Sequence, residues 1–202
     1  METIDSILAF WFGTDTDDAA TAQAQGKLWW QKQPETDALI RQRFAGYTHQ
    51  AANGALQDWA ATPSGMLALI LLTDQFPRNM YRDTPQAFAF DGLARACCKQ
   101  GLAAGLDLPL RPIQRVFFYL PLEHSESLPD QQQSVRLFEK LAEANAGSRR
   151  PAGQTFAGYV DFAKRHHEIV RRFGRFPHRN RILGRASTAE ETAFLQEKGS
   201  SF

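Results

Sequence analysis

Apolar residues recur at intervals of three and four along most of this 202-residue chain. That spacing places them on one face of an α-helix, whereas no segment shows the strict alternation that is typical of a strand. The pattern predicts an all-α protein with about nine helices, joined as neighbouring antiparallel pairs. The predicted helices cover residues 3–12, 19–30, 34–50, 62–76, 84–101, 111–120, 129–145, 154–173 and 187–195, with a further helical turn at 56–60.

Prolines and capping residues indicate where the helices begin and end. A proline is favoured in the first helical turn, where its fixed φ fits and its missing N–H is not needed. This signature occurs at Pro34, Pro63, Pro85, Pro112 and Pro129. Pro77 is expected to end the helix before it, and residues 147–153 are predicted to form a loop. The stretch Ser187-Thr188-Ala189-Glu190 matches a capping box that opens the last helix.

Length and composition narrow the class of protein. With 43% apolar residues, the chain is expected to form one helical domain over residues 1–202. A net charge of only +1 argues against a nucleic-acid partner. The longest apolar run, residues 66–72, is far too short to cross a bilayer, so no membrane partner is expected. Adjacent Cys97 and Cys98 without a secretory signal indicate a reducing, cytoplasmic location. The oligomeric state is not indicated.

The positive charge is concentrated in one region. Residues 164–185 contain eight of the 23 Lys and Arg but one of the 22 Asp and Glu. Within this region lies a stretch that we call the arginine segment, residues 171–180, in which Gly174 and Pro177 are expected to end a helix and fix a turn. Crowded guanidinium groups repel one another, so this segment predicts either internal acidic partners or an anionic ligand.

Two other stretches place polar groups at the ends of apolar helices. Asp74 continues an otherwise apolar stripe and is expected to join a buried network with Gln75 and Arg78. A second polar cluster, residues 121–126, directly follows an apolar helix and contains His124. His166 lies within or beside an apolar face of a later helix, where a histidine is more often a satisfied core residue than a functional one.

Three motifs together resemble a family of bacterial proteins of unknown function, DUF924. They are residues 69–79 (LILLTDQFPRN), 119–126 (YLPLEHSE) and 172–180 (RFGRFPHRN), and the resemblance runs from residue 7 to residue 185. It implies a tetratricopeptide-repeat-like superhelix of stacked helix pairs, although the sequence shows no repeat of fixed period. The family has no established activity or cofactor that the resemblance could suggest for this chain.

The candidate site residues come from these motifs. His124 and His166 are candidates for acid–base catalysis, because imidazole titrates near neutral pH. The candidates for binding a ligand are Asp74, Gln75, Arg78, Glu126, Arg172, Arg175, His178, Arg179 and Asn180. No metal ligand set, phosphate-binding loop or dinucleotide motif is present, so neither a metal nor a cofactor is expected.

Three interpretations of this set stay open from the sequence. The residues could form a pocket for an anionic small molecule or an acidic peptide. They could instead serve a hydrolase or transferase that acts on a phosphorylated or carboxylated small molecule. They could also be an interhelical salt-bridge network with no ligand. All three predict that the motifs converge in space. The pocket interpretation further predicts an excess of arginine over carboxylate, with Arg171 facing water.

An aromatic pair is the remaining feature of interest. Trp29 and Trp30 are interpreted as one core ring and one partly exposed ring, with a stacking platform for a ligand as the less common alternative.

Overall fold

A computed structural model describes residues 1–146 and 156–201, and these residues contain helices and no strands. The all-α prediction is therefore confirmed. The helices are α1 (Ile4–Phe12), α2 (Asp18–Trp30), α3 (Pro34–Ala52), α4 (Pro63–Ile70), α5 (Phe76–Met80), α6 (Asp91–Ala103), α7 (Pro112–Glu123), α8 (Leu128–Ala144), α9 (Phe156–Phe173) and α10 (Ala189–Phe194). Short 3-10 turns cover Gln57–Ala61, Pro85–Phe88 and Pro177–Arg179. The predicted loop at 147–153 lies outside the described residues.

The prediction that Pro77 ends a helix is wrong. Helices α4 and α5 are one continuous rod, joined by a π-turn at Leu71–Gln75 in which the Phe76 N–H bonds the Leu71 carbonyl five residues back. A π-turn widens the backbone locally, so the rod accommodates a proline that would clash in a regular α-helix. With this rod counted once, the described residues form nine helices, as the pattern predicts.

The capping box of the last helix is shifted by one residue from its predicted position. Thr188, not Ser187, accepts the N–H of Glu191, and the Glu191 carboxylate accepts the Thr188 N–H at 2.7 Å. Glu191 also receives a bidentate ion pair from Arg175. The Arg175–Glu191 ion pair joins residues that are far apart in the sequence, so the local sequence does not predict it. This pair favours the capping box of Thr188 and Glu191 over the alternative with Ser187 and Glu190.

Aromatic side chains fill the core that supports the site. Trp11, Phe44, Phe76 and Phe117 are fully buried. The Phe44 and Phe76 rings lie 4.6 Å apart, and those of Trp11 and Phe117 lie 5.6 Å apart edge to face. Large rings that pack this way dominate the burial of apolar surface. The core therefore fixes α1, α3, α5 and α7 relative to one another.

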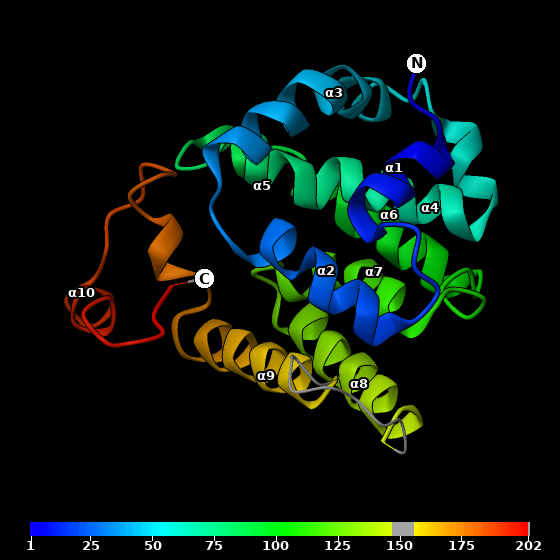
Figure 1. Cartoon of the computed structure of the whole chain (residues 1–202). Helices are drawn as coiled ribbons and strands as arrows, with labels where there is room; N and C mark the ends of the chain where they lie inside the picture. The colour runs from blue at the N-terminus through cyan, green and yellow to red at the C-terminus, as the bar shows by residue number, and fades with distance from the viewer. Residues whose placement is uncertain (147–155, 202) are drawn as a thin grey trace.

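The helices pack mainly as pairs, with the C-terminal region on one side (Figure 1). Helices α8 and α9 lie side by side along their length, and α3 lies against α5. The chain from the end of α9 to α10, drawn in orange and red, lies beside the ends of α5 and α9. This arrangement brings the arginine segment to the ends of α5 and α7. The superhelical stacking that the resemblance implies stays a prediction.

Helix α7 approaches α6 closely through Gly101. A Cβ atom at this position would lie 2.5 Å from the Phe118 ring and 3.0 Å from Met66. Both neighbours are fully buried, so neither has room to move away. The close approach of α6 fixes α7, whose C-terminal end carries site residues.

We expect Gly101→Ala to lower the free energy of unfolding by about 1–3 kcal/mol through overpacking. The matched control is Gly46→Ala in α3, where no atom lies within 4 Å of the added Cβ. That change should raise stability by about 0.5–1 kcal/mol, because alanine is the better helix former. Urea denaturation measures both, and a gain in stability in Gly101→Ala would contradict the packing argument.

Candidate functional site

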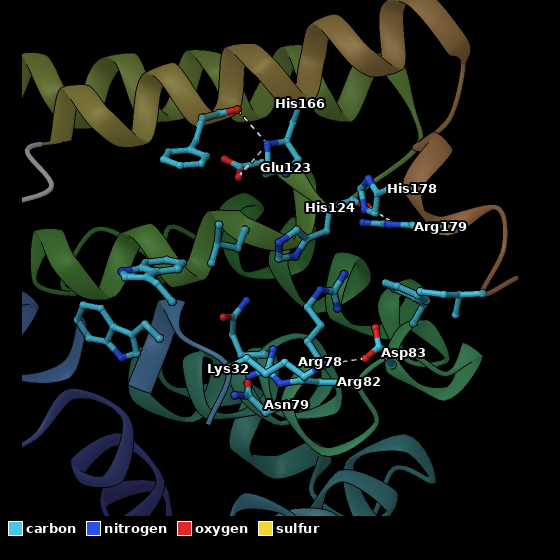
Figure 2. Close-up of a pocket in the computed structure, with 18 of the residues that line it drawn as sticks. Lys32, Arg78, Asn79, Arg82, Asp83, Glu123, His124, His166, His178 and Arg179 are labelled. Atoms are coloured by element: carbon cyan, nitrogen blue, oxygen red, sulfur yellow. Dashed lines mark hydrogen bonds and ion pairs between the residues drawn. The ribbon is translucent and has the colours of Figure 1, made fainter. Parts of the chain in front are cut away.

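A cavity of about 530 Å³ opens where the motifs meet, and Figure 2 shows the side chains that line it. Its walls come from the C-terminal ends of α2 and α7, from α5, from α9, and from the two 3-10 turns at Pro85–Phe88 and Pro177–Arg179. The lining residues are Trp29, Trp30, Lys32, Gln75, Arg78, Asn79, Arg82, Asp83, Ala87, Phe88, Leu120, Glu123, His124, Tyr159, Phe162, His166, His178, Arg179 and Ile182.

Asp74 and His124 form a buried pair behind this wall. The Asp74 carboxylate is fully buried on the π-turn and accepts from His124 Nδ1 at 2.8 and 3.0 Å and from Gln75 Nε2 at 2.6 Å. Burial alone would raise the pKa of Asp74, but the nearby charge of Arg78 and the contacts with His124 hold it well below its usual value. An ionised carboxylate only accepts, so His124 Nδ1 carries a hydrogen.

The other ring nitrogen of His124 therefore has a lone pair. Nε2 makes no hydrogen bond with any described residue, and the ring lies on the cavity wall. Burial and the charge of Arg78 lower the pKa of His124. The ring is consequently neutral near pH 7, with a basic nitrogen available to a ligand.

Arg78 links the π-turn to α6. It donates to both Asp91 oxygens at 2.8 and 3.0 Å and to the Asp74 carbonyl at 2.9 Å, and its Nη1 lies 3.3 Å from the Asp74 carboxylate. Fork-to-fork pairing of this kind is strong and directional. The predicted Asp74–Arg78 pair is present. Asp91 was not among the predicted site residues, because it opens α6 with no local signal of an arginine partner.

Arg179 is the member of the arginine segment that reaches the cavity. Its side chain is 8% exposed and lies between the Phe88 and Phe176 rings, 4.8 and 4.4 Å from their centroids. Nη1 donates to the His124 carbonyl at 3.0 Å, whereas Nε is buried without a hydrogen-bond partner. The nearest carboxylate oxygen is on Asp91, 3.7 Å away. Burial and the charge of Arg78 lower the pKa of Arg179 to about 10, so it stays positive at pH 7.

Glu123 and His166 meet at the opposite wall. Glu123 Oε1 lies 3.4 Å from His166 Nδ1, and that nitrogen also donates to the Phe162 carbonyl at 2.9 Å. Burial and the charge of Asp74 raise the pKa of Glu123 to about 8, and burial lowers the pKa of His166 to about 3. Both groups are therefore neutral near pH 7, and their contact is not an ion pair.

Lys32, Asp83 and Arg82 also line the cavity, and they take part in one exposed and one partly buried ion pair. Lys32 Nζ lies 2.8 Å from the Asp83 carboxylate. Arg82 donates from Nε and Nη2 to the two Asp37 carboxylate oxygens, at 2.6 and 3.0 Å. Asp83 has a φ of +60°, which a non-glycine residue adopts rarely. His178 lies on the same wall as Arg179, and burial lowers its pKa to about 4.

Other predicted site residues stabilise the C-terminal region instead of lining the cavity. Arg172 pairs with exposed Glu190 at 2.8 Å, and Arg175 pairs with Glu191 at 2.6 Å. Asn180 donates to Glu191 at 3.3 Å. All three therefore secure the arginine segment to α10. Arg171 faces solvent, as predicted, and pairs with Glu168 one turn away.

Glu126 also has a structural partner. Its carboxylate accepts a bidentate pair from Arg185 at 2.7 and 2.9 Å and the Phe176 N–H at 2.8 Å. These bonds join the end of α7 to the arginine segment. Arg185 was missed as a partner, because its position after the segment gives no sign that the chain folds back.

The formal charges around the cavity balance instead of leaving the predicted positive excess, and the least compensated cation lies at one place, Arg179. Four cations line it, and each has a carboxylate within 4 Å; the cations are Lys32, Arg78, Arg82 and Arg179, and the carboxylates are Asp37, Asp74, Asp83 and Asp91. The formal charges balance because Glu123 and the three histidines are neutral. Arg179, however, shares Asp91 with Arg78 at a longer distance. Uncompensated positive potential is thus concentrated at Arg179.

Two classes of site are not found in the part of the chain that the structure describes. There, no group of three or more His, Cys, Asp and Glu side chains could hold a metal ion. Outside 147–155 and 202, no helix is long and apolar enough to cross a membrane.

Fold and site together define a class: a helical protein with a cavity walled by arginine, histidine and aromatic side chains. Residues 7–199 match the family described as bacterial protein of unknown function (DUF924), and the chain belongs to that family. A solved structure of a protein of unknown function from Agrobacterium tumefaciens is similar, with 35% identity, 96% of each chain covered and a TM-score of 0.80. No curated protein shows significant similarity to the chain.

The raised pKa of Glu123 predicts how the free energy of unfolding changes with pH. Between its ordinary value of 4.5 and about 8, the folded protein holds a proton that the unfolded chain has lost, so this group's contribution to stability falls as pH rises. Glu123→Gln should remove that slope. Relative to the unmodified protein, the variant should gain up to about 1.4 kcal/mol per pH unit from pH 5 to 8.

Urea denaturation at several pH values measures this difference. Glu126→Gln is the matched control, because Arg185 and the Phe176 N–H lower the pKa of Glu126 despite its partial burial. Its effect on stability should stay constant from pH 5 to 8. Equal slopes for the unmodified protein and Glu123→Gln would show that Glu123 is ionised in the folded state.

Proposed function

We propose that this protein binds a small organic anion, a phosphate or carboxylate compound, in the cavity beside Arg179. The observation that carries the proposal is the incomplete pairing of a buried guanidinium. Arg179 has one hydrogen bond, to the His124 carbonyl, and a 3.7 Å contact with a carboxylate that Arg78 already holds. Its Nε has no partner, and its Nη2 donates to no described residue.

Such an arrangement is unfavourable without a ligand. An unsatisfied buried donor costs about 1–3 kcal/mol, and a charged one more. Nε itself is out of reach of solvent, so an anion in the cavity would accept from Nη2 and would lower the cost of the buried charge by neutralising it. His124 and His178 are neutral and add no like charge beside this position, and His124 Nε2 can accept a hydrogen bond from a hydroxyl group or a protonated oxygen of the ligand. A cavity of about 530 Å³ suits a small molecule better than a peptide.

Phosphate, sulfate and carboxylate compounds should therefore raise the thermal midpoint at constant ionic strength. At one hundred times its dissociation constant, a specific ligand adds about 2.7 kcal/mol of stability. Arg179→Met keeps an apolar stem between the two rings but removes the charge, so it should abolish this gain. Arg171→Met makes the same chemical change at an exposed position outside the cavity and should retain it. If no anion stabilises the protein beyond a chloride control, the network is structural and the proposal fails.

A second candidate function is acid–base catalysis on the bound anion, as in a hydrolase or transferase. The observation that favours it is the Asp74–His124 pair, in which the carboxylate fixes the tautomer and leaves Nε2 unpaired at the cavity. Nε2 could take the proton of a water or hydroxyl group that attacks the ligand, and Asp74 would stabilise the imidazolium formed. His166 lacks the support of an ionised carboxylate, because its Nδ1 bonds the neutral Phe162 carbonyl and nearby Glu123 is protonated near pH 7.

His124→Gln tests this candidate, with p-nitrophenyl phosphate and p-nitrophenyl carboxylate esters as probes. If the protein hydrolyses either class, the variant should lose about 10²- to 10⁴-fold in turnover. Stabilisation by phosphate should persist, because Arg179 is unchanged. His49→Gln, on an exposed face of α3, should keep full activity. Turnover that survives in His124→Gln would exclude His124 as the base.

A further inference from the structure

We infer that the ligand is an amphiphile, with its anionic group at Arg179 and a flat apolar body against Trp30 and Phe162. This inference rests on the proposed binding of a small organic anion and specifies what else that anion carries. The observation behind it is that two exposed aromatic rings line the same cavity, and an inorganic anion would leave them unused.

Exposure singles out the two rings. The described residues contain five large exposed hydrophobic residues, and of these only Trp30 and Phe162 line the cavity. Trp30 is 42% exposed and Phe162 is 38% exposed, whereas the adjacent Trp29 is 7% exposed. Large apolar surface that remains open inside a cavity is a common mark of a ligand-binding site.

Packing holds the Trp30 ring rigid. It ends α2 and stacks nearly parallel on buried Phe117, with centroids 5.7 Å apart and planes 15° apart. The Tyr159 ring of α9 lies 6.1 Å from it. A ring fixed before binding loses little conformational entropy when a ligand stacks on it. Trp30 is thus a preformed platform instead of a loose surface side chain.

Helix α7 connects the aromatic end to the charged end. Leu120, Glu123 and His124 lie at i, i+3 and i+4, so they share one face of the helix, and all three line the cavity. The carbonyl of His124 receives Arg179. On α9, Phe162 precedes His166 by one turn and bonds it through its carbonyl. A helical turn rises about 5.4 Å, so on each helix the apolar residue lies about that far from the histidine. One small ligand can therefore span the distance between the apolar and the polar part of the cavity.

The cavity volume agrees with a ligand of two parts. A phosphate or acetate ion would occupy only a small fraction of about 530 Å³. An aryl or similar flat group attached to the anion would fill the remainder and cover the exposed faces of Trp30 and Phe162. Stacking on one aromatic side chain contributes about 1–3 kcal/mol, which corresponds to a change in affinity of about five- to 150-fold.

The test compares matched anions with and without an aromatic body: phosphate with phenyl phosphate, and acetate with phenylacetate. Calorimetry gives the affinities and tryptophan fluorescence reports contact with the platform. We expect the aromatic member of at least one pair to bind about tenfold tighter or more, and to quench the fluorescence. The pair that shows the difference also identifies the preferred anionic group.

Trp30→Ala should reduce the affinity of the aromatic member to that of the bare anion and leave the bare anion unaffected. Trp30→Leu is a second variant in case the alanine variant unfolds, with circular dichroism as the check. Leu108→Ala, 68% exposed and outside the cavity, is the matched control and should bind both members normally. If both members of each pair bind equally, or Trp30→Ala binds them as the unmodified protein does, the amphiphile inference is wrong while anion binding stands. If no anion binds, both proposals fall.

Discussion

The buried carboxylate of Asp74 is the group on which the rest of the site depends. It is fully enclosed, so its charge is tolerated only because Arg78, His124 and Gln75 surround it. These partners come from the rod of α4 and α5 and from the end of α7. Satisfying one charge therefore fixes the relative position of two helices. The π-turn that carries Asp74 is itself a departure from ideal helix geometry of the kind often found at functional sites.

A second layer of charges joins the C-terminal region to this centre. Arg78 extends to Asp91, Arg179 approaches the same carboxylate from the other side, and Glu126 holds Arg185. Most of these pairs are bidentate or close, which is typical of a structural network. Arg179 differs because it enters the cavity with part of its bonding capacity unused. The structural interpretation thus accounts for most of the cluster, and the proposed binding concerns Arg179.

The cavity combines neutral polar groups with a localised charge. Three histidines and Glu123 are uncharged near neutral pH because burial disfavours their ionised forms. They can exchange protons or hydrogen bonds with a ligand without strengthening or cancelling the field of Arg179. Aromatic rings at the other end offer apolar surface. Such a division suits recognition of a molecule with two chemically different ends, and the Asp74–His124 pair adds a basic nitrogen at the charged one.

The sequence by itself determined the helical class, the helix starts marked by prolines and the polar residues that interrupt apolar faces, because these depend on periods of a few residues. It identified Asp74, His124 and Arg179 on that basis. Only the tertiary structure decided which charges meet, since Arg78 pairs 13 residues away and Arg185 pairs 59 residues away. In the tertiary structure Arg172 and Arg175 pair with glutamates of α10, and Trp30 lines the cavity with its ring partly exposed. Partners so distant are selected by how whole helices pack, and no local pattern records that packing.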